Sequence, residues 1–455
     1  MSRDLLITDG VLITCELPTR ILEGSALLVS AGKIAAIGEA SELGARSPEA
    51  EMLSARGQLV LPGNICAHTH FYGAFARGMA IPGASPEAFP AILEKLWWPL
   101  DRSLNLEDVR ASALVCLVDA IRHGTTTLID HHASPNAIDG SLDILAEAVE
   151  MAGVRAVLCY EVTDRDGAPK ARAGIDENVR FLRRCSQGPV ADRRVAAAFG
   201  LHASLTLSDE TLAACRMAAQ EDTAFHVHLA EHEVDEEDCL AKYGERVVFR
   251  LKRLGLLGPR TILAHGVHVD DSEIRLLAES GAWVTHQPRS NMNNGVGVAP
   301  IEAMRAAGVR LGLGNDGFSN AMWEEWEAAY LVHKLWNRDP RRMPGDLVAE
   351  IAWHGNAALA GSFFPDAPLG RLAAGAHADL IFVDYHPTTP LTPGNLPWHV
   401  LFGFHESMVT TTIVAGRVLM QDRRLTTLDE GALTAESRRR AGAVWNRYER
   451  VVPKG

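Results

Sequence analysis

The sequence predicts an α/β protein, a (β/α)8 TIM barrel with a small β-sandwich domain that both chain ends form. From about residue 59, apolar runs of strand length alternate with segments that carry apolar residues at helical spacing. Eight such runs occur in about 260 residues, which suits a closed barrel of parallel strands. Shorter β-like runs with turn signals between them occupy both ends of the chain. An open, doubly wound sheet is the structural alternative.

The elements can be placed along the chain in order. The predicted barrel strands are 59–68, 125–130, 155–161, 195–202, 225–231, 261–265, 283–287 and 309–316. Helical spacing occurs between them at 142–152, 210–220, 272–280 and 301–307. We expect residues 1–60 to form the N-terminal part of the β-sandwich, 61–368 the barrel, and 369–455 the C-terminal part with a terminal helix. Hairpin turns are expected at Asp9-Gly10, Ala31-Gly32 and Ala415-Gly416.

Composition excludes several classes of protein. The chain has 44 basic and 57 acidic residues, a net charge of −13, so a nucleic-acid or anionic-membrane surface is not expected. No apolar run approaches the roughly 20 residues that span a bilayer, and the N-terminus does not resemble a signal peptide. The seven cysteines include no Cys-x-x-Cys pair, which argues against a disulfide framework. We therefore expect a cytoplasmic protein.

Polar side chains end several of the predicted strands. His68 and His70 end the first strand, and alternate residues on a strand point the same way. His228 lies in the fifth run, His265 ends the sixth and Asp316 ends the eighth. Because the carboxyl ends of barrel strands meet at one face, these groups should converge. Imidazoles with one carboxylate form a nitrogen and oxygen site suited to zinc, iron or manganese.

This series of motifs resembles the amidohydrolase superfamily, in particular its aminohydrolase and chlorohydrolase (ATZ/TRZ-like) branch. The matching motifs are Pro62-Gly63-x4-His68-Thr69-His70, His228-x2-Glu231, His265 and Asp316-Gly317, followed by Gly370-Arg371-Leu372-x3-Gly375-x3-Asp379-Leu380. Finer features are similar to the SsnA-type aminohydrolases: Trp97-Trp98-Pro99-Leu100-Asp101, Asp130-His131-His132-Ala133-Ser134-Pro135 and Arg289-Ser290-Asn291-Met292-Asn293-Asn294. That closer group is poorly defined in function, so it narrows the family more than the substrate.

The resemblance implies roles for individual residues. The implied metal ligands are His68, His70, His228 and Asp316; the implied proton-handling groups are Glu231 and His265, together with Asp316; His202 is the implied substrate contact. Binuclear relatives place a carboxylated lysine after the fourth strand, where this chain reads Gly200-Leu201-His202-Ala203. We therefore expect one divalent ion, zinc in the first place, with iron or manganese as alternatives.

The expected reaction is deamination of a nitrogen heterocycle of the purine, pterin or pyrimidine class. A bound metal lowers the pKa of water from 15.7 toward roughly 7, which makes hydroxide available at neutral pH. Asp316 and His265 can accept the proton of that water, and Glu231 can protonate a ring nitrogen as the tetrahedral centre forms. The candidate substrate contacts are His202, Arg289, Asn291, Trp98 and His132.

Two alternatives remain open. One is hydrolytic dechlorination or opening of a cyclic amide by the same kind of site, and release of ammonia would discriminate against both. The other is a barrel that has lost its metal and serves as a binding protein, although here all the implied ligands are present. A homodimer or higher homo-oligomer is expected.

Overall fold

The computed structural model describes residues 4–188 and 193–452. Two parallel sheets form the centre of the larger part of the molecule. The first runs β11-β10-β9-β8 and the second β12-β13-β14-β15-β16. Their strands are β8 (Asn64–Thr69), β9 (Thr125–Asp130), β10 (Arg155–Leu158), β11 (Val195–Ala197), β12 (Phe199–Ala203), β13 (Phe225–Leu229), β14 (Ile262–His265), β15 (Trp283–His286) and β16 (Arg310–Leu313). The strands follow one another in sequence order, as in a (β/α)8 barrel.

The two sheets meet at both of their edges. The predicted fourth strand is divided at Ala198, so that β11 pairs with β10 while β12 pairs with β13. At the other edge, Thr69 and Asp316 form a single parallel bridge, and the Asp316 backbone N–H donates to the His68 carbonyl over 3.0 Å. This second junction joins the first and last barrel strands beside the candidate site.

The first predicted strand, 59–68, is two strands, so that prediction is wrong in detail. β7 (Leu59–Pro62) pairs with β17 (Leu380–Val383) of the smaller part, and β8 begins the barrel. Gly63 separates them, and a Cβ there would lie 2.2 Å from Thr126 Cγ2. The chain therefore passes from one sheet to the other at a point too crowded for any side chain.

The smaller part is built from both chain ends, as expected. A seven-stranded sheet runs β20-β19-β18-β17-β7-β2-β3, and a four-stranded sheet runs β5-β4-β1-β6. Apolar residues of both sheets share one core. The additional strands are β1 (Leu5–Thr8), β2 (Val11–Ile13), β3 (Ile21–Leu22), β4 (Ala26–Ser30), β5 (Lys33–Gly38), β6 (Glu51–Ser54), β18 (Val409–Val414), β19 (Arg417–Gln421) and β20 (Arg424–Leu425).

Two of the three predicted hairpins are present. β4 and β5 pair antiparallel around Ala31-Gly32, and β18 and β19 pair antiparallel around Ala415-Gly416. The prediction at Asp9-Gly10 is wrong, because β1 and β2 lie in different sheets. The Asp9 carboxylate accepts hydrogen bonds from the Thr8 and Ser54 hydroxyls, which tie the turn to β6 instead.

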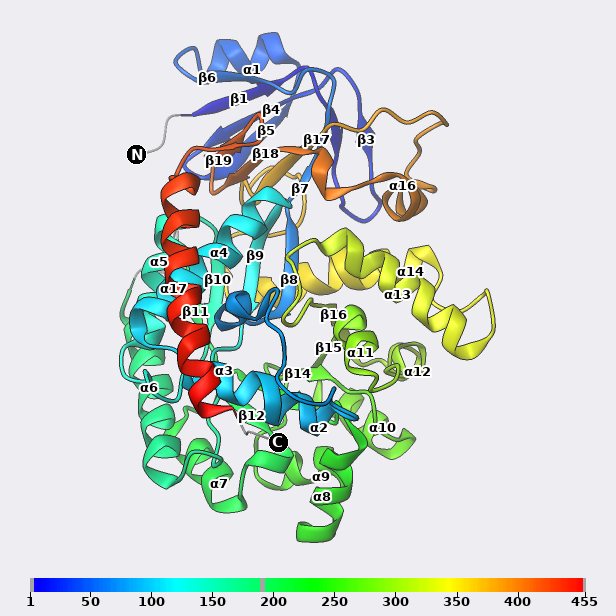
Figure 1. The fold of residues 1–455 in the computed structure, drawn as a ribbon. Helices are drawn as coiled ribbons and strands as arrows, with labels where there is room; N and C mark the ends of the chain where they lie inside the picture. The colour runs from blue at the N-terminus through cyan, green and yellow to red at the C-terminus, as the bar shows by residue number, and fades with distance from the viewer. Residues whose placement is uncertain (1–3, 189–192, 453–455) are drawn as a thin grey trace.

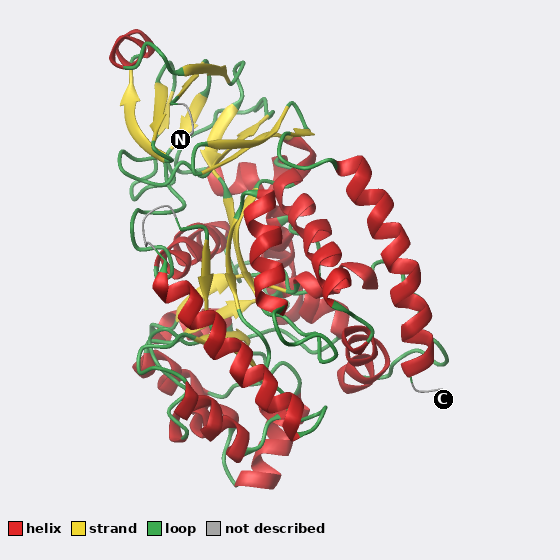
Figure 2. Ribbon diagram, turned by 90° about the vertical axis from the view of Figure 1, so that its left-hand side faces the viewer, coloured by secondary structure: helices red, strands yellow, loops and turns green. Residues whose placement is uncertain are grey.

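Helices cover the outside of the barrel (Figures 1 and 2). They are α2 (Phe89–Ile92), α3 (Trp98–Arg102), α4 (Leu106–Arg122), α5 (Ser141–Ala152), α6 (Ala168–Gln187), α7 (Asp209–Ala218), α8 (Glu233–Tyr243), α9 (Val247–Arg253), α10 (Asp271–Ser280), α11 (Pro288–Asn294), α12 (Ile301–Ala307), α13 (Met322–Asn337), α14 (Gly345–Ala349) and α15 (Asn356–Gly361). α1 (Ala40–Arg46) lies in the smaller part, and α16 (Leu396–Gly403) packs against α13 and α14. None of the helices in the described ranges is long and apolar enough to cross a membrane.

The terminal helix α17 (Glu430–Val451) packs on the barrel helices α3 and α4 (Figure 1). It follows the C-terminal strands of the smaller part and then runs along the side of the barrel. Its N-cap, Asp429, accepts a hydrogen bond from the Ala432 backbone N–H, which satisfies one of the free donors of the first turn. The last segment of the chain is therefore structurally part of the barrel surface.

Candidate active site

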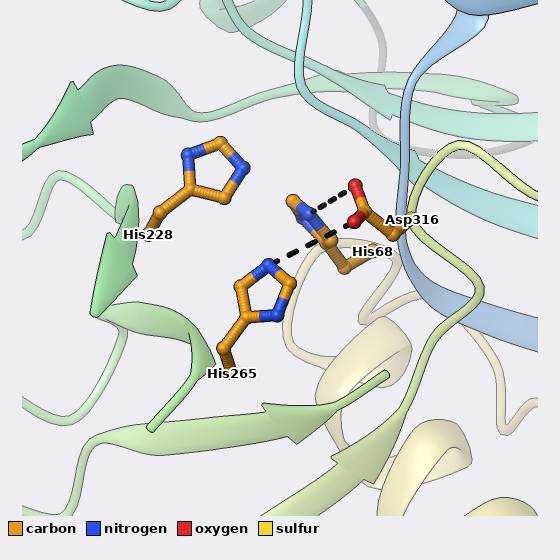
Figure 3. A group of neighbouring side chains, drawn as sticks. All are labelled: His68, His228, His265 and Asp316. Atoms are coloured by element: carbon orange, nitrogen blue, oxygen red, sulfur yellow. Dashed lines mark ion pairs between the residues drawn. The ribbon is translucent and has the colours of Figure 1, made fainter. Parts of the chain in front are cut away.

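Histidine and carboxylate side chains converge where the barrel strands end (Figure 3). His68 lies in β8, His228 in β13 and His265 at the end of β14, while Asp316 follows β16. Asp316 Oδ1 lies 2.9 Å from His70 Nε2 and 3.6 Å from His68 Nε2, and Asp316 Oδ2 lies 3.9 Å from His265 Nε2. His70 Nε2 is also 3.3 Å from His228 Nε2.

These residues fit a metal ion. One side-chain nitrogen or oxygen from each of His68, His228, His265 and Asp316 lies within 4.8 Å of the others. His68 Nε2 is buried and has no hydrogen-bond partner in the described part of the chain. A buried ring nitrogen without a partner is costly unless something binds it. Three imidazoles and one carboxylate are a donor set that zinc accepts.

Hydrogen bonds at Nδ1 fix the orientation of the rings. His70 Nδ1 faces the His131 carbonyl, and His228 Nδ1 lies 2.8 Å from the His202 carbonyl. His265 Nδ1 lies 2.8 Å from Asn291 Oδ1. Carbonyl and amide oxygens accept hydrogen bonds, so these rings carry their protons on Nδ1 and turn a free Nε2 toward the centre.

Two residues of the site have strained backbones. His265 and Asp316 have φ angles of 75° and 57°, in the left-handed region that non-glycine residues rarely adopt. Such strain persists only where the surrounding structure imposes it, and it concentrates at functional sites. It turns both side chains toward the shared centre.

The carboxyl groups of Glu231 and Asp316 differ in their electrostatics. Burial raises the pKa of Glu231 to about 7, although the neighbouring His265, 3.5 Å away, opposes the shift. Burial would also raise the pKa of Asp316, but the neighbouring imidazoles of His68 and His70 hold it well below its usual value. Two carboxyl groups of one site, one easily protonated and one ionised, can divide the proton-donating and proton-accepting roles.

A cavity of about 870 Å³, including its open mouth, lies over this cluster. Its apolar wall is mainly aromatic and includes Tyr72, Phe89, Leu93, Trp97, Trp98 and Phe318. Its polar wall includes His202, Glu231 and Asn294. Asn294 Nδ2 donates to Glu231 Oε1 over 3.2 Å. A flat ring with polar edges suits such a surface.

The structure brings two of the five predicted substrate contacts, His202 and Trp98, to the cavity wall. Arg289 is not there, because its guanidinium pairs with Glu325 and donates to the Ser319 carbonyl over 2.7 Å. Asn291 is buried and positions His265. His132 is fully buried, and its Nε2 lies 2.8 Å from Ser134 Oγ. We therefore correct the candidate contact set to His202 and Trp98.

Sequence reasoning missed several polar residues of the cavity wall. Glu161, Ser290 and Asn294 line it, and the Ser290 hydroxyl donates to the Asp316 carboxylate. Glu161 was within reach of the strand-end argument, since it closes the predicted run 155–161. Ser290 and Asn294 lie on α11, within the motif 289–294 noted in the sequence, from which Arg289 and Asn291 were chosen instead.

This fold and site define a class of protein. The chain matches the sequence profile of the Amidohydrolase family over residues 59–419, and it belongs to that family. The resemblance of the sequence motifs to this superfamily and the predicted barrel fold are thereby confirmed.

Individual relatives are similar along their whole length. The chain is 34% identical over 453 residues to a 5-methylthioadenosine/S-adenosylhomocysteine deaminase of Haloarcula marismortui, covering 98% of this chain and 99% of the relative. It is 33% identical over 446 residues to a 5'-deoxyadenosine deaminase of Methanosarcina mazei, covering 96% and 98%. The crystal structure of an adenosine deaminase from Xanthomonas campestris with bound zinc superposes with a TM-score of 0.85 at 26% identity, covering 98% and 99%.

Proposed function

We propose that this protein is a metal-dependent deaminase of a nitrogen heterocycle, with amino-substituted purines as the first candidates. The observation that carries the proposal is the convergence of His68, His70, His228 and Asp316 on one point, with Glu231 beside it under an aromatic cavity. The deaminase names of the relatives support the same reaction.

His68, His70, His228 and Asp316 would hold one divalent ion, zinc in the first place. In the cluster of mutually close ligand atoms, His265 takes the place of His70, but His70 is the better fourth ligand. His70 Nε2 lies 2.9 Å from Asp316 Oδ1, whereas His265 Nε2 lies 3.9 Å from Asp316 Oδ2 and 3.5 Å from Glu231 Oε2. A bound ion supplies an acidified water as nucleophile at neutral pH.

The chain's own residues then move protons and hold the substrate. Asp316 and His265 lie close enough to one another to accept and retain the proton of the attacking water. Glu231, with its raised pKa, carries a proton that it can donate to a ring nitrogen of the substrate. The aromatic wall holds the flat ring against this cluster and restricts water.

The test is an ammonia-release screen of purified, zinc-loaded protein against adenosine, 5'-deoxyadenosine, guanine, cytosine and a pterin. We expect ammonia from at least one of them and about one metal ion per chain. His68→Ala and Asp316→Ala should lose both metal and turnover. Chloride release from a chlorinated triazine without ammonia from any amine would contradict the proposal, as would full metal content in both variants.

A further inference from the structure

A carboxylate of the cavity wall has no part in the proposed reaction. Glu161 follows β10, is 2% exposed and lines the cavity. Its Oε2 lies 3.2 Å from His131 Nδ1 without hydrogen-bond geometry, and its Oε1 lies 4.0 Å from His202 Nε2, beyond hydrogen-bond distance. Burial of a carboxyl group that makes so few hydrogen bonds costs folding free energy, yet the protein keeps a carboxyl group at this position.

The surroundings of Glu161 keep it ionised. His131 Nε2 donates to the His226 carbonyl over 3.1 Å, and its other nitrogen faces the Glu161 carboxylate. Burial alone would raise the pKa of Glu161, but the neighbouring imidazoles of His202 and His131 hold it below its usual value. The cavity therefore presents a negative charge from the side of the third barrel strand.

Glu161 lies close to the reacting centre. A carboxylate oxygen of Glu161 and ring nitrogens of His202 and His228 all lie within 4.8 Å of one another. Because His228 is a proposed metal ligand, a ring bound with its reacting carbon at the metal has one neighbouring atom within reach of Glu161. Glu231 lies on the side of the fifth and sixth strands, beside His265.

The charge of the cavity wall also supports a substrate-binding role for Glu161. Its charged side chains are Glu161, Glu231, Asp235 and Asp316, and neither lysine nor arginine lines it in the described residues. Asp235 already accepts backbone N–H groups of Leu205 and Ala230, over 2.8 and 3.0 Å. Asp316 is a proposed metal ligand and Glu231 is the proposed proton donor. Of these carboxylates, Glu161 is therefore the one that remains to accept a hydrogen bond from the substrate.

We propose that Glu161 is a specificity-determining residue that accepts a hydrogen bond from a ring N–H beside the reacting carbon. The site then selects cyclic amidines and guanidines that carry a ring N–H on one side of that carbon and, on the other side, an unprotonated ring nitrogen for Glu231, and it rejects carboxylated or phosphorylated edges. The inference rests on the proposed function for the placement of the ring. Arg289, the predicted contact that could pair with an anionic ligand, is bound to Glu325 instead.

Equilibrium binding tests this inference separately from turnover. 2-Aminobenzimidazole and 2-aminobenzoxazole have the same shape and amino group, but the second has an oxygen in place of the ring N–H. Isothermal titration calorimetry of the zinc-loaded protein should show the first binding about 10- to 100-fold more tightly, the scale of a hydrogen bond to a charged group. In Glu161→Gln, whose amide can also donate, that ratio should fall to within about threefold of one, with metal content unchanged.

Two further variants separate the effect of the Glu161 carboxylate from a general effect of the substitution. Glu161→Asp keeps the charge but withdraws the carboxylate by one methylene, so the ratio should fall while the fold is retained. Glu236→Gln is the matched control, a buried carboxylate on α8 that lies outside the cavity wall; its ratio should equal that of wild type. An unchanged ratio in both Glu161 variants, or a wild type that does not discriminate, would overturn the proposal. Discrimination without ammonia release from any heterocycle would overturn the proposed reaction and leave this inference standing.

Discussion

At the scale of single residues, the candidate ligand His68 differs from its neighbours in what holds its ring. His70 and His228 face backbone carbonyls, but His68 Nδ1 lies 2.9 Å from His226 Nε2. If His68 offers Nε2 to a metal, its Nδ1 carries the proton and His226 Nε2 must accept it. The proton of His226 then lies on Nδ1, 3.8 Å from Cys159 Sγ. His226 is therefore a candidate positioning residue for the metal site.

Substitution of His226 tests this role. Glutamine places an oxygen acceptor near the position of Nε2, while leucine fills similar space without one. We expect His226→Leu to weaken zinc binding about 10- to 100-fold, the usual effect of losing such a partner, and His226→Gln to retain affinity within a few-fold. Chelator competition measures both. Equal affinities in the two variants would mean that His226 only fills space.

Glu231 gives a prediction about pH. Its folded-state pKa is raised to about 7 by burial, so the proton-donating form is present at lower pH and is lost as pH rises through that value. We expect kcat/KM to fall on the alkaline side with an apparent pKa near 7. Glu231→Gln should lower kcat by at least ~10²-fold with metal content unchanged, and its residual activity should lack this alkaline limb. A wild-type profile that rises through pH 8 would remove Glu231 as the acid.

The residues of the site show what strand-end reasoning can predict. His68, His228 and Asp316 were predictable because the direction of barrel strands brings their ends together. The ion pair of Arg289 was not predicted, because its partner Glu325 lies 36 residues away on α13 and no local sequence pattern indicates that the two residues pair. The position of a side chain that pairs with a residue distant in the sequence can be known only from the tertiary structure.

At the scale of elements, the periodicity of apolar residues predicted the barrel strands and helices well. It failed to predict where the chain passes from one sheet to another. The helix predicted at 301–307 is α12 (Ile301–Ala307), and the strand predicted at 125–130 is β9 (Thr125–Asp130). The divisions at Gly63 and Ala198 were not visible, because a continuous apolar run does not show that its two halves pair in different sheets.

The terminal helix α17 supports a wall of the candidate active site. Trp445 Nε1 donates to the Phe75 carbonyl over 2.8 Å, and the Tyr448 hydroxyl donates to the Lys95 carbonyl. Phe75 and Lys95 belong to the short helical turns Phe71–Ala76 and Leu93–Trp97, which carry the cavity residues Tyr72 and Trp97. The two bonds therefore connect the end of the chain to the aromatic wall.

Removal of these bonds should affect binding more than chemistry. We expect Trp445→Phe with Tyr448→Phe to raise KM severalfold while kcat changes little, and to lower stability by about 1–3 kcal/mol, since two net hydrogen bonds are lost. Steady-state kinetics and urea unfolding measure these effects. Arg439→Ala is the matched control, since Arg439 is an exposed residue of α17 that pairs with Glu436. A loss of kcat with unchanged KM would contradict a supporting role for the helix.

At the scale of the whole molecule, the two ends of the chain are held together by the pairing of β7 with β17, which explains why the smaller part could be predicted as one unit. Sequence patterns could not predict which surface of the molecule is apolar. Leu331, Leu335 and Trp336 are exposed on α13, and Phe402 is exposed on α16, which packs against it. Tyr330 and Phe402 have ring centroids 5.6 Å apart, so exposed apolar side chains of the two helices lie near one another.

A surface of this kind supports the expected homo-oligomer, because large exposed apolar side chains gathered in one place mark sites of association. We expect the protein to be a dimer or larger oligomer at micromolar concentration by light scattering coupled to size exclusion. Leu335→Glu with Trp336→Glu places two like charges on the surface in each subunit, so burial against a second copy would cost desolvation and repulsion, and the mass should fall to that of the monomer. Met217→Glu is the matched control, since Met217 is an exposed apolar residue on α7, distant in sequence from α13 and α16, and its variant should keep the wild-type mass. A monomeric wild type would contradict the oligomer itself. An oligomer that persists in the double variant and binds its subunits as tightly as wild type would place the interface on another face of the barrel.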